Sequence, residues 1–118
     1  AAPVGKRAVL LTCKGKGVEA QGFESTQGFV VKAGSRAVAD VTPTFEQMRG
    51  TRELRGDLIE SGVLVLDGAS YRFTQDYVFT APSAASDMVL GGSSNGRTMW
   101  KDAQGRTLKE LQGQELEH

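Results

Sequence analysis

Histidine and cysteine, on which much enzyme and metal chemistry depends, are almost missing from this chain of 118 residues. There is one cysteine, Cys13, and one histidine, His118, which falls in a terminal Leu116-Glu117-His118 that resembles the remainder of an expression tag. Histidine is the usual general base near neutral pH and the commonest metal ligand. The sequence therefore excludes a Ser-His-Asp or Cys-His catalytic arrangement and argues against zinc, and we expect no cofactor.

Four other signals are absent. No apolar run approaches the roughly 20 residues of a membrane helix, and no charged start followed by an apolar stretch marks a signal peptide. The acidic residues are scattered singly, without the Glu-x-Lys element by which a nuclease gathers magnesium. Fourteen Lys and Arg balance fourteen Asp and Glu, so no overall charge attracts nucleic acid or an anionic membrane. Because a lone thiol also suits a reducing compartment, we expect a cytoplasmic protein without a membrane partner.

Length and composition indicate one domain. A chain of this size, 39% hydrophobic, has enough apolar surface for one core between two layers and too little for two. We find no internal repeat or linker, and we expect a single domain over residues 1–115 with tag residues at 116–118. Since the chain starts at Ala1 without Met, we expect a domain cut from a longer protein, and a monomer when isolated.

The first forty residues have the alternating pattern of strands. The pattern predicts strands over residues 7–13 and 18–23 around a turn at 14–17, a third strand over 28–33, and an extended return over 36–41.

After residue 41 the apolar period changes to that of a helix. Thr44 and Gln47 have the spacing of a capping box, and a short helical segment leads into a helix over residues 51–61. The later elements are a hairpin of strands 63–66 and 70–74 around Asp67-Gly68, an extended stretch 77–80, a helix from Pro82 to Val89 and a final strand with Trp100. The order β-β-β-α-β-β-α-β predicts an α+β domain with a small antiparallel sheet covered by two helices.

The segment Gly91 to Thr98 is one residue away from a phosphate-binding loop, because Arg97 stands where that motif has lysine. Such a loop follows a strand and opens a helix, so that helix amides face the phosphate. Here a predicted helix precedes the segment and a predicted strand follows it. We therefore do not expect nucleotide hydrolysis.

From Phe29 onward, ordered blocks of the chain resemble one known family. The blocks are Phe29-Val30-Val31-Lys32-Ala33-Gly34-Ser35-Arg36-Ala37, Leu54-Arg55-Gly56-Asp57-Leu58-Ile59, Tyr71-Arg72-Phe73-Thr74, Ala81-Pro82-Ser83-Ala84-Ala85-Ser86, Asn95-Gly96, Trp100-Lys101 and Gly105-Arg106-Thr107-Leu108. They are similar to the uncharacterised C-terminal domain of GIY-YIG nucleases and restriction-modification proteins, itself similar to the RAMA (restriction enzyme and adenine methylase associated) group. The resemblance implies a non-catalytic accessory module that recognises DNA, with modified DNA as one option, while another domain of the parent protein does the chemistry.

Charge is uneven along the chain, which gives the DNA interpretation a physical basis. Residues 1–55 hold nine Lys and Arg against five Asp and Glu, a net charge of +4, and the remainder is correspondingly negative. Arg49, Arg52 and Arg55 recur every three residues on a predicted helix and are candidates for phosphate contacts, which the turn residues Lys14 and Lys16 could join. The alternative is an ordinary solvated helix face with ion pairs to its own acids.

A second candidate group surrounds the predicted loop near residue 95. Asn95 can pair with adenine, Arg97 with guanine or phosphate, and Ser93 and Ser94 with phosphate oxygens. The alternative for the loop is a plain turn in which Asn95 bonds its own backbone. Three further candidates are Ser83 at a helix start, Trp100 as a base platform, and its neighbour Lys101; capping and core packing are the alternatives for Ser83 and Trp100.

Three functions remain open on the sequence. The first is a DNA-recognition accessory module of a nuclease or restriction-modification protein. The second is a module that docks a nuclease or methylase without touching DNA, whose mark is an exposed apolar patch. The third is an enzyme, which requires a pocket with converging carboxylates and shifted pKa values.

Overall fold

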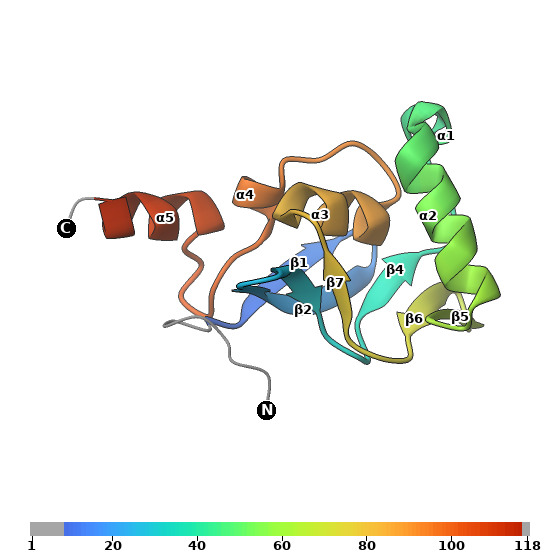
Figure 1. The fold of residues 1–118 in the computed structure, drawn as a ribbon, viewed down its shortest axis with the longest axis horizontal. Coiled ribbons are helices and arrows are strands. Elements are labelled where there is room, and N and C mark those ends of the chain that lie inside the picture. The colour runs from blue at the N-terminus through green and yellow to red at the C-terminus, as the bar shows by residue number, and fades with distance from the viewer. Residues whose placement is uncertain (1–8, 117–118) are drawn as a thin grey trace.

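The structure, a computed structural model, describes residues 9–116 and has the expected α+β class with antiparallel pairing throughout (Figure 1). The elements are β1 (Leu11–Gly15), β2 (Val18–Ser25), β3 (Gly28–Val31), β4 (Arg36–Val38), α1 (Pro43–Gln47), α2 (Arg49–Glu60), β5 (Leu64–Asp67), β6 (Ser70–Phe73), β7 (Tyr77–Phe79), α3 (Pro82–Leu90), α4 (Gly96–Met99) and α5 (Leu108–Leu116). Within this range no helix is long and apolar enough to cross a membrane. Residues 7 and 8 of the first predicted strand and residues 117 and 118 of the predicted tag lie outside the described residues.

The two predicted hairpins are confirmed. β1 and β2 are joined by Lys16 and Gly17, whose φ angles of 52° and 81° are those of a two-residue turn that follows the twist of the strands. In the second hairpin Asp67 still pairs with Ser70, so the turn is Gly68-Ala69, one residue later than predicted.

The strands form two sheets where one was predicted. Sheet A has the order β1-β2-β3-β7 and sheet B the order β4-β6-β5. The chain leaves sheet A at Gly34, whose φ of 88° turns it away from the ladder, and the Ser35 Oγ then bonds the backbone of Gln21. Strands distant in the sequence pair with one another, β3 with β7 and β4 with β6. The alternation of residues within one strand does not show which strand will be its partner.

The two predicted helices are present as α2 and α3, and the predicted short helical segment is α1, while a further helix, α5, was not predicted. The final strand around Trp100 was wrong, because residues 96–99 form α4. The Asn95 side chain accepts a hydrogen bond from the Arg97 amide at 3.0 Å and starts this helix. Lys101 alone keeps an extended pairing, with bridges to Thr12 and Thr107. The cap of α1 also differs: the Thr42 side chain, rather than Thr44, accepts from the Phe45 amide.

One hydrophobic core joins both sheets to the helices. Figure 1 shows α3 and α4 over one side of sheet A and α2 beside sheet B. Trp100 and Phe29 are fully buried with ring centroids 4.6 Å apart, and α2 contributes Leu58. Cys13 lies in the same core, where burial raises the pKa of its thiol to about 11, so it is protonated at neutral pH.

Candidate nucleic-acid interface

The three arginines of α2 do not form one outward strip. A helix turns about 100° per residue, so residues three apart are displaced by about 60°, and Arg55 points about 120° away from Arg49. The Arg55 Nη2 atom donates to the Ala39 carbonyl at 3.0 Å, and its guanidinium lies 5.0 Å from the centre of the Tyr71 ring. Arg55 therefore fastens α2 to sheet B, while Arg49 and Arg52 are exposed.

Arg49 and Arg52 occupy the N-terminal turn of α2, where the helix dipole disfavours positive charge. That turn contains no acidic residue, and Met48 at the N-cap supplies no side-chain acceptor. Arg49, with its side chain 83% exposed, pairs with Glu53 at 3.1 Å, and Arg52 Nη1 donates to the Glu46 carbonyl at 3.0 Å. Most guanidinium donors at this tip therefore face solvent. An anion that bound there would also offset the helix dipole.

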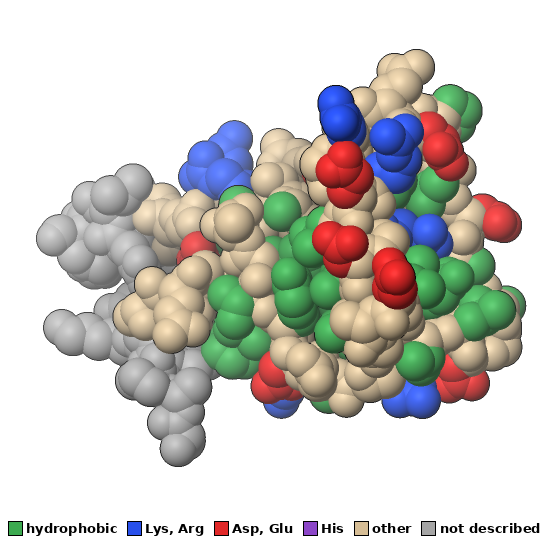
Figure 2. All heavy atoms as spheres, turned by 45° about the vertical axis from the view of Figure 1, so that its right-hand side comes forward, with side chains coloured by type: hydrophobic (Ala, Val, Ile, Leu, Met, Phe, Trp, Pro, Cys, Tyr) green, Lys and Arg blue, Asp and Glu red, His purple; other side chains and the backbone are tan. Residues whose placement is uncertain are grey.

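The remainder of the exposed face of α2 is acidic. Glu53, Asp57 and Glu60 follow at spacings of four and three residues and are all exposed. Figure 2 shows acidic side chains below basic ones on this side of the molecule. These acids repel phosphates, so only the N-terminal tip of α2 is suited to approach a nucleic-acid backbone.

The segment between α3 and α4 is held partly by internal hydrogen bonds. The amide and Oγ of Ser94 both donate to Asp87 Oδ1 at 2.7 Å, and the Oγ atoms of Ser94 and Ser86 are 2.6 Å apart. Ser94 is therefore a structural contact, whereas Ser93 is exposed. The Thr42 amide donates to the Gly91 carbonyl at 2.8 Å, which ties this segment to the start of α1.

Asn95 and Arg97 follow on the same segment and are both exposed. The Asn95 Oδ1 atom accepts a hydrogen bond from the Arg97 amide within its own turn, as the alternative proposed. Its side-chain amide nitrogen has no described partner. Arg97 Nε donates to Gln112 at 2.9 Å and leaves its terminal nitrogens to solvent. The segment is followed by helix α4, as in a phosphate-binding loop, and not by the predicted strand. It is preceded by helix α3, where the motif requires a strand, so the arrangement is not that of a phosphate-binding loop.

Ser83 is exposed, but the start of α3 offers no anion site. The N-cap is Ala81, whose methyl side chain cannot accept a hydrogen bond, and the Ser83 carbonyl accepts a hydrogen bond from the Ser86 hydroxyl. A Cβ atom placed on Gly96 would lie 2.3 Å from the Ser83 nitrogen, so the backbone of α4 occupies the space over this amide. Ser83 therefore neither caps the helix nor presents its amide to a ligand.

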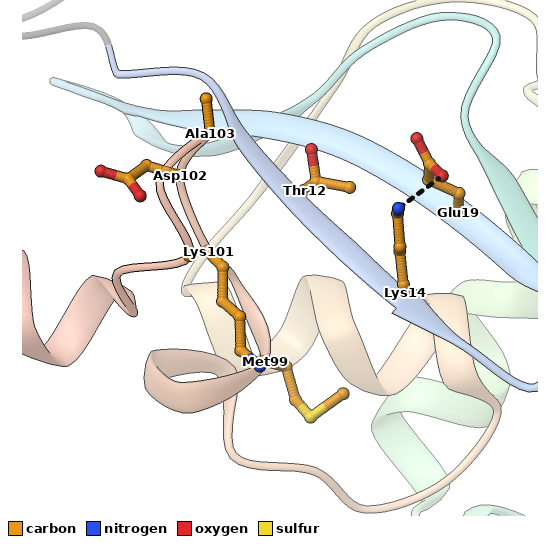
Figure 3. A pocket seen from close by; sticks show the side chains of 8 residues that line it. Thr12, Lys14, Glu19, Met99, Lys101, Asp102 and Ala103 are labelled. Carbon is orange, nitrogen blue, oxygen red and sulfur yellow. Dashed lines mark ion pairs between the residues drawn. The ribbon is translucent and has the colours of Figure 1, made fainter.

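Trp100 is a core residue. Its side chain is 0% exposed, and its Nε1 atom donates to the Pro82 carbonyl at 3.0 Å. A base platform needs an exposed ring face, so the structure places Trp100 in the alternative role that the sequence left open. Its neighbour Lys101 is exposed and lies at the edge of sheet A, beside a cavity of about 400 Å³ (Figure 3).

The surface candidates thus separate into two regions. Figure 1 shows the N-terminal end of α2, the segment between α3 and α4, and α4 itself along one edge of the molecule. We call this edge, with Arg49, Arg52, Ser93, Asn95 and Arg97, the arginine edge. Lys101 belongs to sheet A. Lys16 does not join the edge, because its Nζ atom donates to the Leu90 carbonyl at 2.9 Å, where it complements the C-terminal end of α3.

A charged cluster on sheet B was missed by sequence reasoning. Arg36 and Arg72 pair across β4 and β6, and each donates to Asp67 Oδ2, at 3.0 and 3.1 Å. The hydrogen bond from Arg72, and then the positive charge of Arg36, lower the pKa of Asp67 below its ordinary value. Only the strand register brings these residues together, so no local signal in the sequence identified the cluster.

A second acid is held in the loop after Trp100. Burial of the Asp102 carboxylate opposes its ionisation, but hydrogen bonds from the amide and side chain of Arg106 and from the Gln104 amide outweigh that effect. The pKa of Asp102 consequently lies below its ordinary value. Asp102 therefore fixes the turn that connects Lys101 to α5.

These two carboxylates give the stability of the domain an acid dependence. Both ionise more readily in the folded chain than in the unfolded one, so their contribution is complete above the ordinary aspartate pKa of about 4 and is lost as pH falls through the lower folded values. We expect the free energy of unfolding, measured in urea between about pH 2 and 7, to fall below about pH 4. Asp67→Asn and Asp102→Asn should each flatten that fall, and curves parallel to the wild type would contradict the assignment.

The geometry defines a class of protein before any comparison: a small α+β domain whose exposed arginines gather at one edge. Among residues 9–116, no three His, Cys, Asp or Glu side chains lie close enough to hold a metal ion. The family described as Domain of unknown function (DUF4357) matches residues 11–112, and the chain belongs to that family. Neither the curated proteins nor the solved structures give a match.

Proposed function

We propose that this domain is a non-catalytic DNA-recognition module of a nuclease or restriction-modification type protein, in which another domain performs the chemistry. The observation that carries the proposal is the pair of exposed arginines, Arg49 and Arg52, in the acid-free first turn of α2. Positive charge in that turn destabilises the isolated helix and becomes favourable when an anion is bound. A row of backbone phosphates is the anion that matches several separated cations on one edge.

The rest of the arginine edge supports a duplex more than a single phosphate. Arg97 adds a third exposed guanidinium, and Asn95 and Ser93 supply neutral donors between it and α2. Phosphate contacts of this kind position a protein on DNA, while an Asn amide can contact a base edge. We assign Arg49, Arg52 and Arg97 to phosphates and Asn95 to base contacts, with modified DNA as one substrate class.

The resemblance of the sequence blocks to the RAMA-like domains of GIY-YIG and restriction-modification proteins also supports the proposal. In that setting the partners are DNA and the other domains of the parent protein, in the cytoplasm, and the isolated domain is a monomer. No cofactor is involved.

A docking module for a nuclease or methylase is the second candidate, and Leu66 favours it. This side chain is 62% exposed on β5, which lies at the edge of sheet B. An exposed apolar side chain beside an unpaired strand edge suits contact with another protein. Absence of duplex binding together with binding of a neighbouring domain through Leu66 would favour this second function.

The double variant Arg49→Gln/Arg52→Gln tests the first function. Each lost phosphate contact removes about 0.9 from the slope of log affinity against log salt, so we expect the slope to fall by about 2 and duplex affinity to drop about tenfold at ~50 mM salt. Fluorescence anisotropy with a labelled duplex measures both. The matched control is Lys14→Gln/Lys101→Gln, which removes the same charge from sheet A; equal losses in both variants would contradict a specific role for the arginine edge.

A further inference from the structure

The side chain of Gln112 connects α5 to both α4 and sheet A. Its Oε1 atom accepts a hydrogen bond from Arg97 Nε at 2.9 Å, and its Nε2 atom lies 3.4 Å from both carboxylate oxygens of Glu24 on β2. A guanidinium can only donate and an ionised carboxylate can only accept. An amide, which has one oxygen and one NH₂ group, fits between them in a single orientation, with its oxygen toward Arg97.

Helix α5 is fastened to the domain at the turn that precedes Gln112. Thr107 and Glu110 form a capping box, in which the Glu110 amide donates to Thr107 Oγ1 at 3.2 Å and the Thr107 amide donates to Glu110 Oε1 at 3.4 Å. Leu108 is 4% exposed, and its amide donates to the Trp100 carbonyl at 2.9 Å. Gln112 follows Leu108 by four residues and so lies on the same face of α5, which lies beside α4 in Figure 1.

The contact with Gln112 uses one edge of the Arg97 guanidinium. The Nε atom is engaged, whereas Nη1 and Nη2 have no described partner. Two parallel N–H groups of a guanidinium match the oxygens of a phosphate. An arginine that is already held in one conformation loses less side-chain freedom when it binds, so the contact favours binding through these two atoms.

A neutral amide orients Arg97 without cancelling its charge. Arg49 is held differently, by the carboxylate of Glu53 at 3.1 Å. In the contact with Arg97 the amide of Gln112 stands between the guanidinium and the carboxylate of Glu24. A carboxylate in the place of this amide would pair with the guanidinium and compete with a phosphate. Glutamine at position 112 therefore supplies orientation and leaves the positive charge in place.

We propose that Gln112 is a positioning residue of the arginine edge, which holds Arg97 with its two terminal nitrogens available to a backbone phosphate. The inference rests on the proposed function, because it names the residue that prepares Arg97 for the phosphate assigned to it. It also makes the docking of α5 a part of DNA binding.

Gln112→Leu and Gln112→Glu separate orientation from charge. Leucine removes the acceptor and keeps the charge of Arg97, whereas glutamate keeps the acceptor and neutralises the charge. In fluorescence anisotropy with a labelled duplex at ~50 mM salt, we expect Gln112→Leu to lower the affinity about threefold with an unchanged salt slope. We expect Gln112→Glu to lower it about tenfold, with a slope smaller by about 0.9.

Two comparisons show whether these losses act through Arg97. Gln104→Leu and Gln104→Glu make the same changes at an exposed glutamine whose side chain has no described hydrogen bond, and should alter the affinity less than about twofold. In an Arg97→Gln background, Gln112→Leu should have no further effect on affinity. A threefold loss that persists in that background would overturn the positioning role.

NMR of the Arg97 Nε–H group without DNA tests the contact by itself. We expect this proton to exchange with water faster in Gln112→Leu than in the wild type, and to stay protected in Gln112→Glu. Equal exchange in all three proteins would show that Gln112 does not hold Arg97. A wild type that binds duplex no better than Gln112→Leu would overturn the positioning role alone, whereas a wild type that binds no duplex at ~50 mM salt would overturn the proposed function with it.

Discussion

Replacing Trp100 with alanine is expected to lower the free energy of unfolding by about 3–5 kcal/mol, the range for truncation of a large buried aromatic side chain. The ring is fully buried against Phe29, and its Nε1 hydrogen bond to the Pro82 carbonyl joins the loop after α4 to the start of α3. Alanine leaves a cavity and removes this hydrogen bond at the same place. Urea unfolding followed by circular dichroism measures the loss.

Trp100→Phe is the matched control, because it keeps an aromatic ring and removes the indole donor. We expect an intermediate loss, of about 1–2 kcal/mol, from the missing hydrogen bond and the smaller ring. A wild-type stability for Trp100→Ala would show that the ring is not in the core, and would reopen its role as a base platform.

Gly96→Ala is the second change with a large expected effect, a destabilisation of about 3 kcal/mol from overpacking. Alanine is otherwise favoured in a helix, and Gly96 opens α4 without a positive φ. An added Cβ atom, however, would lie 2.3 Å from the backbone of Pro82 and Ser83, which can move only if α3 and α4 separate. The expected loss therefore measures how tightly these helices pack.

Gly56→Ala in α2 provides the control for that variant. Its added Cβ meets nothing within 4 Å, so only helix propensity changes and the domain should gain about 0.5–1 kcal/mol. Thermal unfolding of the two variants side by side should shift the midpoint in opposite directions. A neutral Gly96→Ala would mean that α4 is not seated against the start of α3.

Much of the fold could be predicted from local sequence, since each hairpin has alternation on both strands and turn residues between them. Residue types alone predict the turn at Lys16-Gly17 and the end of α3 at Gly91. Helix α4 could not be predicted, because Thr98 and Trp100 favour strands and the packing of Gly96 on α3 decides the outcome. The division into two sheets depends on pairings between distant segments, such as β3 with β7.

The candidate site was predictable in part for similar reasons. The exposure of Arg49 and Arg52 follows from their place on the helix. Because a helix rotates about 100° per residue, three residues fall short of a full turn, and Arg55 therefore points to a different side of α2 from Arg49. The apolar row Phe23, Val30 and Val78 on sheet A could not be predicted, because only the pairing of β2 with β3 and of β3 with β7 aligns these residues. Neither it nor the Arg36–Asp67–Arg72 cluster has a local motif.

Recognition of DNA by the arginine edge is the central claim, and an NMR titration of the ¹⁵N-labelled domain tests it most directly. Short duplexes, unmodified and adenine-methylated, are added at ~50 and ~200 mM salt, because phosphate contacts weaken steeply over that range. We expect amide shifts at residues 49–52 and 93–97 that fade at the higher salt, with any dependence on the methyl group centred on Asn95. No shifts at ~50 mM salt, or shifts confined to other surfaces, would contradict the claim and favour the docking function.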